Sequence, residues 1–144
     1  MRRWTACSAQ LWTVFWAALR SWAKARLIRS AACPTRGTSP AVALPVVIAS
    51  TPGTDLRLWD RVLPLLPRAC RLVGYDRRGH GLSSIGGGAT LADHVDNAIA
   101  VIEAAACGPV DFVGQSVGGL IGQGVTNRRP VLGRALVLSN KTAT

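Results

Sequence analysis

The sequence predicts an α/β protein, with a parallel sheet of about four strands and helices on both faces. Short continuous apolar runs, as expected for strands buried on both faces, alternate with stretches of helical spacing. The order strand, helix, strand, helix, strand, helix, strand implies right-handed crossovers between parallel strands. A Gly-x-Ser-x-Gly segment also joins the third apolar run to the helix that follows it, as in sheets that present a serine at a sharp turn.

Four short apolar runs are the predicted strands. They are Val46–Ala49, Arg71–Tyr75, Val110–Val113 and Arg134–Leu138. Each is four or five residues long, a length that favours a strand over a buried helix.

The segments between these runs carry apolar residues at helical spacing. Asp55–Leu66 is expected to be helical, with its last turn distorted by Pro64. The next helix begins after Thr90 and Asp93, a capping-box-like pair with an acid in place of the usual Glu or Gln. The apolar face of that helix comprises Leu91, Val95, Ile99 and Ile102. A third helix is predicted over Val117–Asn127.

Most of the net positive charge of the chain lies N-terminal to the predicted folded domain. The formal net charge is +10, but residues 1–40 contain seven basic residues and no acid. From residue 41 onward, ten basic residues face seven acids. A nucleic-acid-binding domain is expected to carry its basic residues on the folded part, within a recognisable module. The sequence therefore predicts no nucleic-acid partner.

Residues 1–44 are predicted to be an atypical basic, Trp-rich segment and linker, and residues 45–144 the folded domain. The apolar stretch Leu11–Leu19 is nine residues long, too short to span a membrane. A signal-peptide core, a transit peptide and a membrane-surface helix are all compatible with this composition. We favour a stretch that was not selected to fold, such as an altered start or reading frame, and expect no membrane association.

Cysteine usage favours a cytoplasmic protein. Cys7, Cys33, Cys70 and Cys107 are widely spaced, with no C-x-x-C pair and no nearby histidine. This pattern predicts neither a zinc site nor a disulfide framework. Reduced, mostly buried thiols are expected instead.

Ser116 is the candidate nucleophile, because Gly114-Gln-Ser-Val-Gly118 follows a strand and precedes a helix. Such a strained turn presents the serine hydroxyl above a parallel sheet. A side chain at either flanking glycine would collide with the neighbouring strand or with the helix packing back over it. The competing interpretation is a Gly-rich turn with a structural role only.

A serine nucleophile also needs a histidine to take its proton and two backbone N–H groups for the developing oxyanion. The amide of Val117 is the expected first donor. Thr51, in the loop after the first predicted strand, is the expected second donor, since Pro52 has no N–H. An ordinary turn at residues 51–53 is the alternative.

Neither histidine of the chain is predicted to be catalytic. His80 lies in a Gly-rich turn, where packing and hydrogen bonding explain it best, and His94 is expected to be a solvated residue on the polar face of a helix. Asp76 is a candidate for the carboxylate that would orient the histidine of a Ser–His–Asp catalytic triad. An acid between a strand and a Gly-rich turn more often accepts hydrogen bonds from the N–H groups of that turn.

Several segments carry a resemblance to a known family. Gly114–Gly118 and Asp76–Gly81 are similar to the first half of an α/β-hydrolase. Ser50–Asp60, Tyr75–Ser83 and Leu136–Asn140 more closely resemble 3-oxoadipate enol-lactonases of the β-ketoadipate pathway, which catabolises aromatic compounds.

The resemblance covers about residues 45–140 and implies hydrolysis of an enol-lactone or similar small ester, with no metal or organic cofactor. It also implies that Ser116 is the nucleophile and that Thr51 and Val117 occupy the oxyanion-hole positions. If the substrate carries a carboxylate, Arg57 or Arg128 is a candidate partner. Both are equally well explained as solvated surface charges.

The chain departs from this family in three respects. The two strands with which members begin are expected to be absent. No Asp, Glu or His follows Ser116, although the family order is Ser, then Asp, then His, and Asn140 and Lys141 stand where a variant acid would lie. The lid and last strands are also missing, so the sequence predicts a partial α/β-hydrolase fold, truncated before the C-terminal strands, with negligible turnover on its own. The alternatives are a non-catalytic remnant, a chain that associates with another polypeptide through its incomplete sheet, and a carboxylesterase of other specificity.

Overall fold

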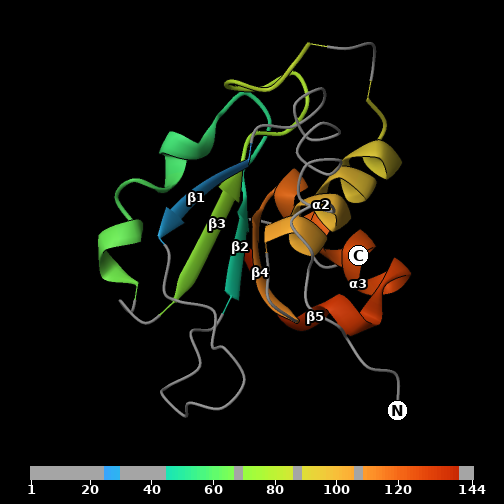
Figure 1. Ribbon diagram of the computed structural model, residues 1–144. Coiled ribbons are helices and arrows are strands. Elements are labelled where there is room, and N and C mark those ends of the chain that lie inside the picture. Colours follow the sequence, from blue (N-terminus) through green and yellow to red (C-terminus); the bar gives the residue numbers. More distant parts are fainter. Residues whose placement is uncertain (1–24, 30–44, 67–69, 86–88, 106–108, 140–144) are drawn as a thin grey trace, which may run out of the picture.

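The computed structural model describes residues 25–29, 45–66, 70–85, 89–105 and 109–139. Within this part of the chain, five strands form one sheet in the order β1-β3-β2-β4-β5 (Figure 1). The strands are β1 (Ala25–Arg29), β2 (Pro45–Ala49), β3 (Arg71–Tyr75), β4 (Val110–Gln115) and β5 (Gly133–Ser139). The pairs β3·β2, β2·β4 and β4·β5 are all parallel, which confirms the predicted four-stranded parallel sheet.

The first strand corrects the expectation that nothing before residue 45 belongs to the fold. β1 pairs antiparallel with β3, with Ala25 opposite Tyr75 and a register irregularity between Leu27 and Arg29. The rest of residues 1–44 lies outside the described residues, and so do Cys7, Cys33 and Cys107. Cys70 is a free, half-buried thiol.

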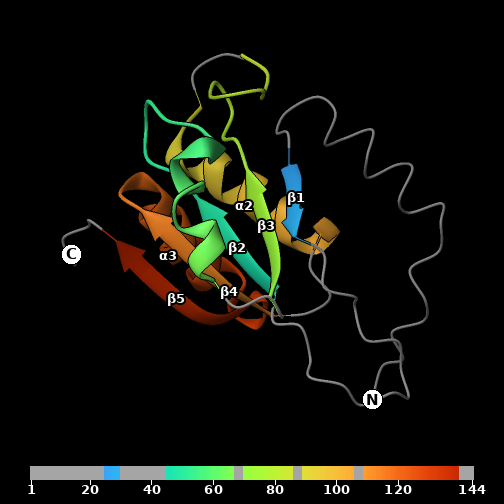
Figure 2. The same ribbon diagram turned by 90° about the vertical axis from the view of Figure 1, so that its left-hand side faces the viewer.

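Helical elements cover both faces of the sheet, but unequally. The helices α2 (Leu91–Ala105) and α3 (Val117–Arg128) lie together on one face. The opposite face, turned toward the viewer in Figure 2, carries the short 3₁₀ helices η1 (Leu56–Trp59) and η2 (Leu63–Leu65). A third 3₁₀ turn, η3 (Pro130–Leu132), precedes β5. Among the described residues, no helix is both long and apolar enough to cross a bilayer.

The prediction of one helix over Asp55–Leu66 is therefore wrong, because the segment contains two short 3₁₀ helices instead. Asp55 caps η1 by accepting a 2.8 Å bond from the Arg57 amide, and the bonds that follow run from residue i+3 to residue i. Pro64 has no N–H, and its ring would clash with the Asp60 carbonyl in an α-helix. The segment consequently folds as two separate 3₁₀ turns.

The described core consists of two apolar clusters, one on each face of the sheet. The larger packs β-strand residues such as Val47 and Phe112 against Val101 and Ile121 of the two helices. The smaller packs Ile48 and Leu72 against Trp59 of η1. Both clusters fix β2 and β4, the strands whose carboxyl ends lead into the candidate site.

The start of α2 has the predicted capping box. The Thr90 amide and hydroxyl donate to the Asp93 carboxylate at 2.8 and 2.6 Å, and the Asp93 amide donates back to the hydroxyl at 3.2 Å. These bonds hold the pKa of Asp93 below its ordinary value. Val95 and Ile102 are buried as expected, whereas Leu91, in the first turn, is 44% exposed.

Candidate active site

Ser116 occupies a strained backbone conformation at the turn between β4 and α3. Its φ is +53° and its ψ is −118°, and it is the one non-glycine residue with positive φ in the described part of the chain. A side chain in such a region costs about 1–3 kcal/mol and persists only where the surrounding structure enforces it. The half-buried Ser116 side chain makes no capping bond to α3, so the hydroxyl is not used to begin the helix.

The flanking glycines enforce this turn. A Cβ at Gly114 would lie 2.3 Å from the carbonyl oxygen of Gly118, and a Cβ at Gly118 would lie 2.4 Å from the carbonyl oxygen of Ala49. The first contact brings α3 down onto the end of β4, and the second brings α3 against β2. The predicted steric role of both glycines is thereby confirmed.

Backbone hydrogen bonds hold the strained residue on both sides. The Ser116 amide donates to the Ser139 carbonyl of β5 at 3.0 Å. The Ser116 carbonyl accepts from the amides of Gly119 at 2.9 Å and Leu120 at 3.3 Å, which closes the first turn of α3. The amide of Val117, at the first helical position, has no acceptor within the helix.

The loop that follows β2 begins beside this turn, because Ala49 pairs with Gly114 and touches Gly118. Thr51 is half-buried, and its carbonyl accepts from the Thr54 hydroxyl at 2.9 Å. Buried Ser50 anchors the loop: its hydroxyl donates to the Asp55 carbonyl at 3.2 Å and accepts from the Trp59 indole N–H at 3.0 Å. Thr51 and Val117 therefore lie at the same edge of the sheet, on segments that are in contact.

Asp76 fastens a second loop to the first. Its Oδ1 accepts from the Leu56 amide at 2.9 Å, and its Oδ2 accepts from the Leu82 amide at 3.1 Å. Gly81 has a φ of +52°, and a Cβ there would lie 2.3 Å from the same carboxylate. The expected hydrogen-bonding role of Asp76 in its turn is confirmed. The sequence did not indicate the second hydrogen bond of Asp76, which it accepts from Leu56 of η1.

His80 is held in its turn by both ring nitrogens. Nε2 lies 3.0 Å from Nη2 of Arg77, and Nδ1 lies 3.1 Å from the carbonyl oxygen of Arg78. Because a guanidinium can only donate, Nε2 accepts and Nδ1 carries the proton, so the ring is neutral in this arrangement. Arg77 is itself buried, and burial lowers its pKa. The expected packing role of His80 is confirmed.

His94 is buried, which corrects the expectation of a solvated surface residue. It is 9% exposed, and its Nδ1 has no hydrogen-bond partner. Burial, followed by the positive charge of Arg77 and the proximity of His80, lowers the pKa of His94. His94 lies four and seven residues before Ala98 and Val101, which are also buried. That helical spacing was the signal by which the sequence could have revealed its position.

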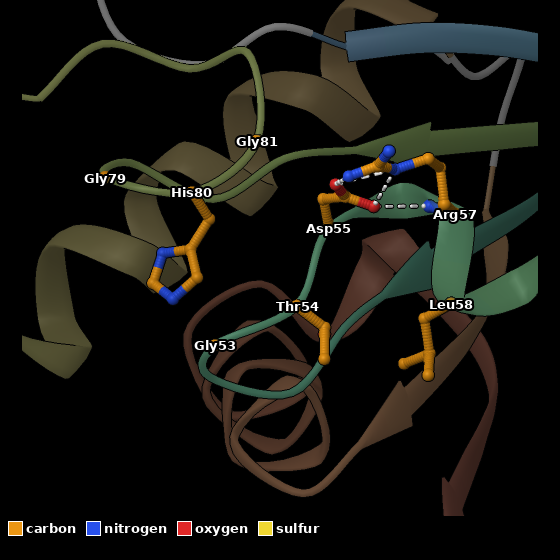
Figure 3. Close-up of a pocket in the computed structure, with 8 residues that line it drawn as sticks. All are labelled: Gly53, Thr54, Asp55, Arg57, Leu58, Gly79, His80 and Gly81. Atoms are coloured by element: carbon orange, nitrogen blue, oxygen red, sulfur yellow. Dashed lines mark hydrogen bonds and ion pairs between the residues drawn. The ribbon is translucent and has the colours of Figure 1, made fainter.

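An open cleft of about 610 Å³ lies between the two loops (Figure 3). Its lining comprises Gly53, Thr54, Asp55, Arg57, Leu58, Gly79, His80 and Gly81. The His80 ring extends from its turn toward the loop that carries Gly53. Ser116, Thr51 and Val117 are not among the lining residues. Within the described ranges, no cluster of His, Cys, Asp and Glu could hold a metal ion.

Of the two candidate arginines, only Arg57 lies at this cleft. Its exposed guanidinium pairs with Asp55 at 2.6 Å, and this contact lowers the pKa of Asp55. Arg128 ends α3 and pairs with Asp96 of α2 at 2.5 Å. The length of α3 places Arg128 about 18 Å from the serine turn. Arg128 is thus a surface charge of the helix pair.

The site as a whole combines a parallel sheet, a serine held at positive φ at a strand end, and close-packed glycines on either side of it. This combination is characteristic of the serine-presenting strand–turn–helix elbow of α/β enzymes. Residues 46–140 match the model of the Alpha/beta hydrolase family. The chain belongs to the α/β-hydrolase family, which confirms the family resemblance seen in the sequence.

The relatives that this chain resembles are hydrolases named for different substrates. The chain is 32% identical to (E)-2-((N-methylformamido)methylene)succinate hydrolase of Acinetobacter baylyi, over 67% of this chain and 37% of that protein. It is also 32% identical to 3-oxoadipate enol-lactonase 1 of the same species, over 52% of this chain and 28% of that protein. The structure of a Pseudomonas aeruginosa hydrolase superposes with a TM-score of 0.68 at 32% identity, over 81% of this chain and 40% of that one. The chain thus spans about two fifths or less of the length of these relatives.

Proposed function

We propose that this chain is the nucleophile-bearing part of a serine hydrolase that cleaves carboxylic esters, with 3-oxoadipate enol-lactone as the substrate of the complete enzyme. The observation that carries the proposal is the positive φ of Ser116. Strain of this kind is retained where it serves function, and no capping bond of the hydroxyl explains it.

In the proposed reaction, Ser116 Oγ attacks the lactone carbonyl carbon and transfers its proton to a base. The amides of Val117 and Thr51 donate to the resulting oxyanion. Collapse of the tetrahedral intermediate breaks the ring C–O bond, the base returns its proton to the departing enol oxygen, and the acyl group stays on Ser116. Water then gives a proton to the base and attacks the acyl carbon; the acyl–Oγ bond breaks, the base protonates Oγ, and the carboxylic acid leaves. The reaction uses no cofactor.

The choice of an enol-lactone is supported by the sequence segments shared with the lactonases and by the identity to the A. baylyi enol-lactonase. Arg57, at the rim of the cleft, is suited to a substrate carboxylate once it exchanges its contact with Asp55. A carboxylesterase with another acyl group is the second candidate. A relative of equal identity is named as a hydrolase of (N-methylformamido)methylene succinate, so the names of the relatives do not agree on one substrate.

The general base is not assigned to either histidine of this chain. Both ring nitrogens of His80 are engaged, and His94 is buried on the α2 side of the turn. Without a base, the oxyanion donors and substrate binding alone leave only about 10³–10⁴-fold catalysis over water. We therefore expect negligible turnover from the 144 residues alone; a non-catalytic role for the separate chain is the competing proposal.

A chimera tests the assignment of Ser116. Residues 45–139 would replace the structurally corresponding part of A. baylyi 3-oxoadipate enol-lactonase 1, so that the lactonase supplies the remaining strands and its own base. The chimera is expected to hydrolyse enol-lactone, and Ser116→Ala is expected to lower kcat by about 10⁴–10⁶-fold. Ser139→Ala is the matched control, because Ser139 contributes only its carbonyl to the turn. A folded chimera whose activity survives Ser116→Ala would refute the nucleophile.

A further inference from the structure

Arg77 is a buried arginine whose positive charge is not paired with an acid. Its side chain is 4% exposed, and within the described residues its guanidinium makes one hydrogen bond, from Nη2 to Nε2 of His80 at 3.0 Å. Because His80 is neutral in this contact, it does not compensate the charge of Arg77. A buried charge is costly unless it is paired, so Arg77 is expected to have an anionic partner.

None of the seven acidic residues of the sequence supplies that partner. All seven lie in the described part of the chain, and four of them pair with other arginines. The carboxylate of Asp76 accepts from two backbone amides, and that of Asp93 accepts from Thr90. Asp60 is exposed at the end of η1. The partner of Arg77 is therefore not an acidic side chain of this sequence.

The position of Arg77 after β3 places it on the α2 side of the sheet. Tyr75, the last residue of β3, packs in the larger core cluster with Val95 of α2. Asp76 lies on the opposite side, where it binds the amide of η1. Since successive side chains alternate along a strand, Arg77 lies on the same side as Tyr75. Burial raises the pKa of Tyr75 and lowers that of His94 on α2, and the charge of Arg77 lowers both.

Two other buried groups on this side have polar atoms without a hydrogen-bond partner among the described residues. They are the hydroxyl of Tyr75, which is 1% exposed, and Nδ1 of His94, which is 9% exposed. Buried polar atoms are nearly always hydrogen-bonded in native proteins. The Tyr75 hydroxyl is a donor, and a neutral imidazole can carry its proton on Nδ1. Together with Arg77, these groups are a set of donors, which is what an anion requires.

We propose that Arg77, Tyr75 and His94 form a binding site for the carboxylate group of a small organic acid. With Tyr75 and His94 neutral, the site has one positive charge, so a monoanion neutralises it and a dianion such as phosphate leaves a buried negative charge. Hydrogen bonds, and then the charge of Arg78, lower the pKa of Asp93, and this carboxylate offsets Arg78. A planar guanidinium also matches both oxygens of a carboxylate.

The cleft gives such a ligand a route to Arg77. His80 lines the cleft between Gly79 and Gly81 (Figure 3), and its Nε2 is the atom that accepts from Arg77. A charged carboxylate oxygen is a stronger acceptor than a neutral imidazole nitrogen, so a ligand entering from the cleft replaces His80 at Nη2. The site does not include Ser116, and it is independent of the proposed hydrolase reaction.

Acetate titration of the complete 144-residue chain tests this site. Sodium acetate would replace sodium chloride at constant ionic strength and neutral pH, with urea unfolding followed by circular dichroism. At an acetate concentration about tenfold above the Kd, the ratio of folded to unfolded chain should rise about 11-fold, which corresponds to roughly 0.5–1 M in the urea midpoint. The imidazole ¹⁵N shifts of His94 should change with acetate and saturate at the same Kd.

Four variants locate the binding. Arg77→Gln should abolish the acetate dependence, and without acetate it should be no less stable than the wild type, because it removes an uncompensated buried charge. Arg128→Gln is the matched control, which removes a surface arginine and should keep the dependence. Tyr75→Phe deletes only an unpartnered hydroxyl, so it should fold normally and weaken acetate binding about 10-fold or more. Ser116→Ala should bind acetate as tightly as the wild type.

The outcomes that overturn the site are distinct. Equal effects of acetate and chloride on the wild type, or an acetate effect that persists in Arg77→Gln, would refute it. Loss of the effect in Arg57→Gln but not in Arg77→Gln would place the anion at the rim of the cleft. Tighter binding of inorganic phosphate than of acetate would refute the carboxylate assignment. If Arg77→Gln does not fold, Tyr75→Phe decides, and unchanged acetate binding in that variant would overturn the proposal.

Discussion

Replacing Gly114 by alanine should disturb the serine turn directly, because it adds a methyl group where α3 packs onto the end of β4. The added Cβ would lie 2.3 Å from the Gly118 carbonyl oxygen, 2.4 Å from its carbon and 2.5 Å from the Gly119 nitrogen. All three are backbone atoms, so no side-chain rotation relieves the contact. The oxygen is about 0.7 Å inside the 3.0 Å below which real Cβ contacts essentially do not occur, and α3 must move away from β4.

The magnitude follows from two opposing effects. Overpacking of a close contact costs about 1–3 kcal/mol. Replacement of glycine by alanine in a strand returns about 0.5–1 kcal/mol, because the unfolded chain loses conformational freedom. The net loss in the free energy of unfolding is therefore about 0–2.5 kcal/mol, centred near 1 kcal/mol, and the central value corresponds to a fall of roughly 0.5 M in the urea midpoint.

Urea unfolding followed by circular dichroism measures this loss directly. Gly133→Ala is the matched control, because a Cβ at Gly133 meets nothing closer than 3.6 Å and its φ is −100°. That variant should be as stable as the wild type or gain about 0.4–1 kcal/mol. If Gly114→Ala were as stable as Gly133→Ala, the close approach of α3 to β4 would not be what holds the turn.

Two further predictions concern the loops around the site. Asp76→Asn places an amide group against the N–H of Leu56 or Leu82, so it should lower the unfolding free energy by about 1–3 kcal/mol, and a change below about 0.5 kcal/mol in urea unfolding would argue against the clamp. Burial and nearby positive charge lower the pKa of His94 in the folded state. As the pH falls, His94 is therefore protonated in the unfolded chain before it is protonated in the folded chain. The free energy of unfolding should be highest above about pH 6.5 and should decrease as the pH drops below that value. His94→Gln should flatten this dependence in urea midpoints taken from pH 5 to 8, and parallel profiles for variant and wild type would refute the assignment.

The features of this fold that depend on local pattern could be predicted from the sequence. The four parallel strands follow from short apolar runs, and β3 has the predicted bounds of Arg71–Tyr75. The serine turn is equally local, since two glycines within two residues of Ser116 are what allow α3 to approach the sheet. Each of these features is encoded within a few neighbouring residues.

Two other kinds of feature could not be predicted in the same way: those decided by competing local preferences, and those that depend on residues far away in the sequence. The apolar spacing of residues 55–66 indicated a helix, but the missing N–H and the ring of Pro64 favoured two 3₁₀ turns. β1 has basic residues within its five positions and is defined by pairing with β3, more than 40 residues later. The Asp76–Leu56 hydrogen bond joins residues 20 positions apart. Neither an aspartate nor a leucine at these positions indicates from the sequence that the two residues interact.

Substitution of Ser116 by glycine tests most directly whether this chain gives up stability to hold a serine hydroxyl at the turn. Relief of the positive φ should gain about 1–3 kcal/mol, against about 0.5–1 kcal/mol lost to the freer unfolded chain. In urea unfolding, Ser116→Gly should therefore be more stable than Ser116→Ala, which keeps the strain and also lacks the hydroxyl. If Ser116→Gly were instead the less stable of the two, as at an ordinary position, the serine would not be strained and the nucleophile assignment would lose its physical basis.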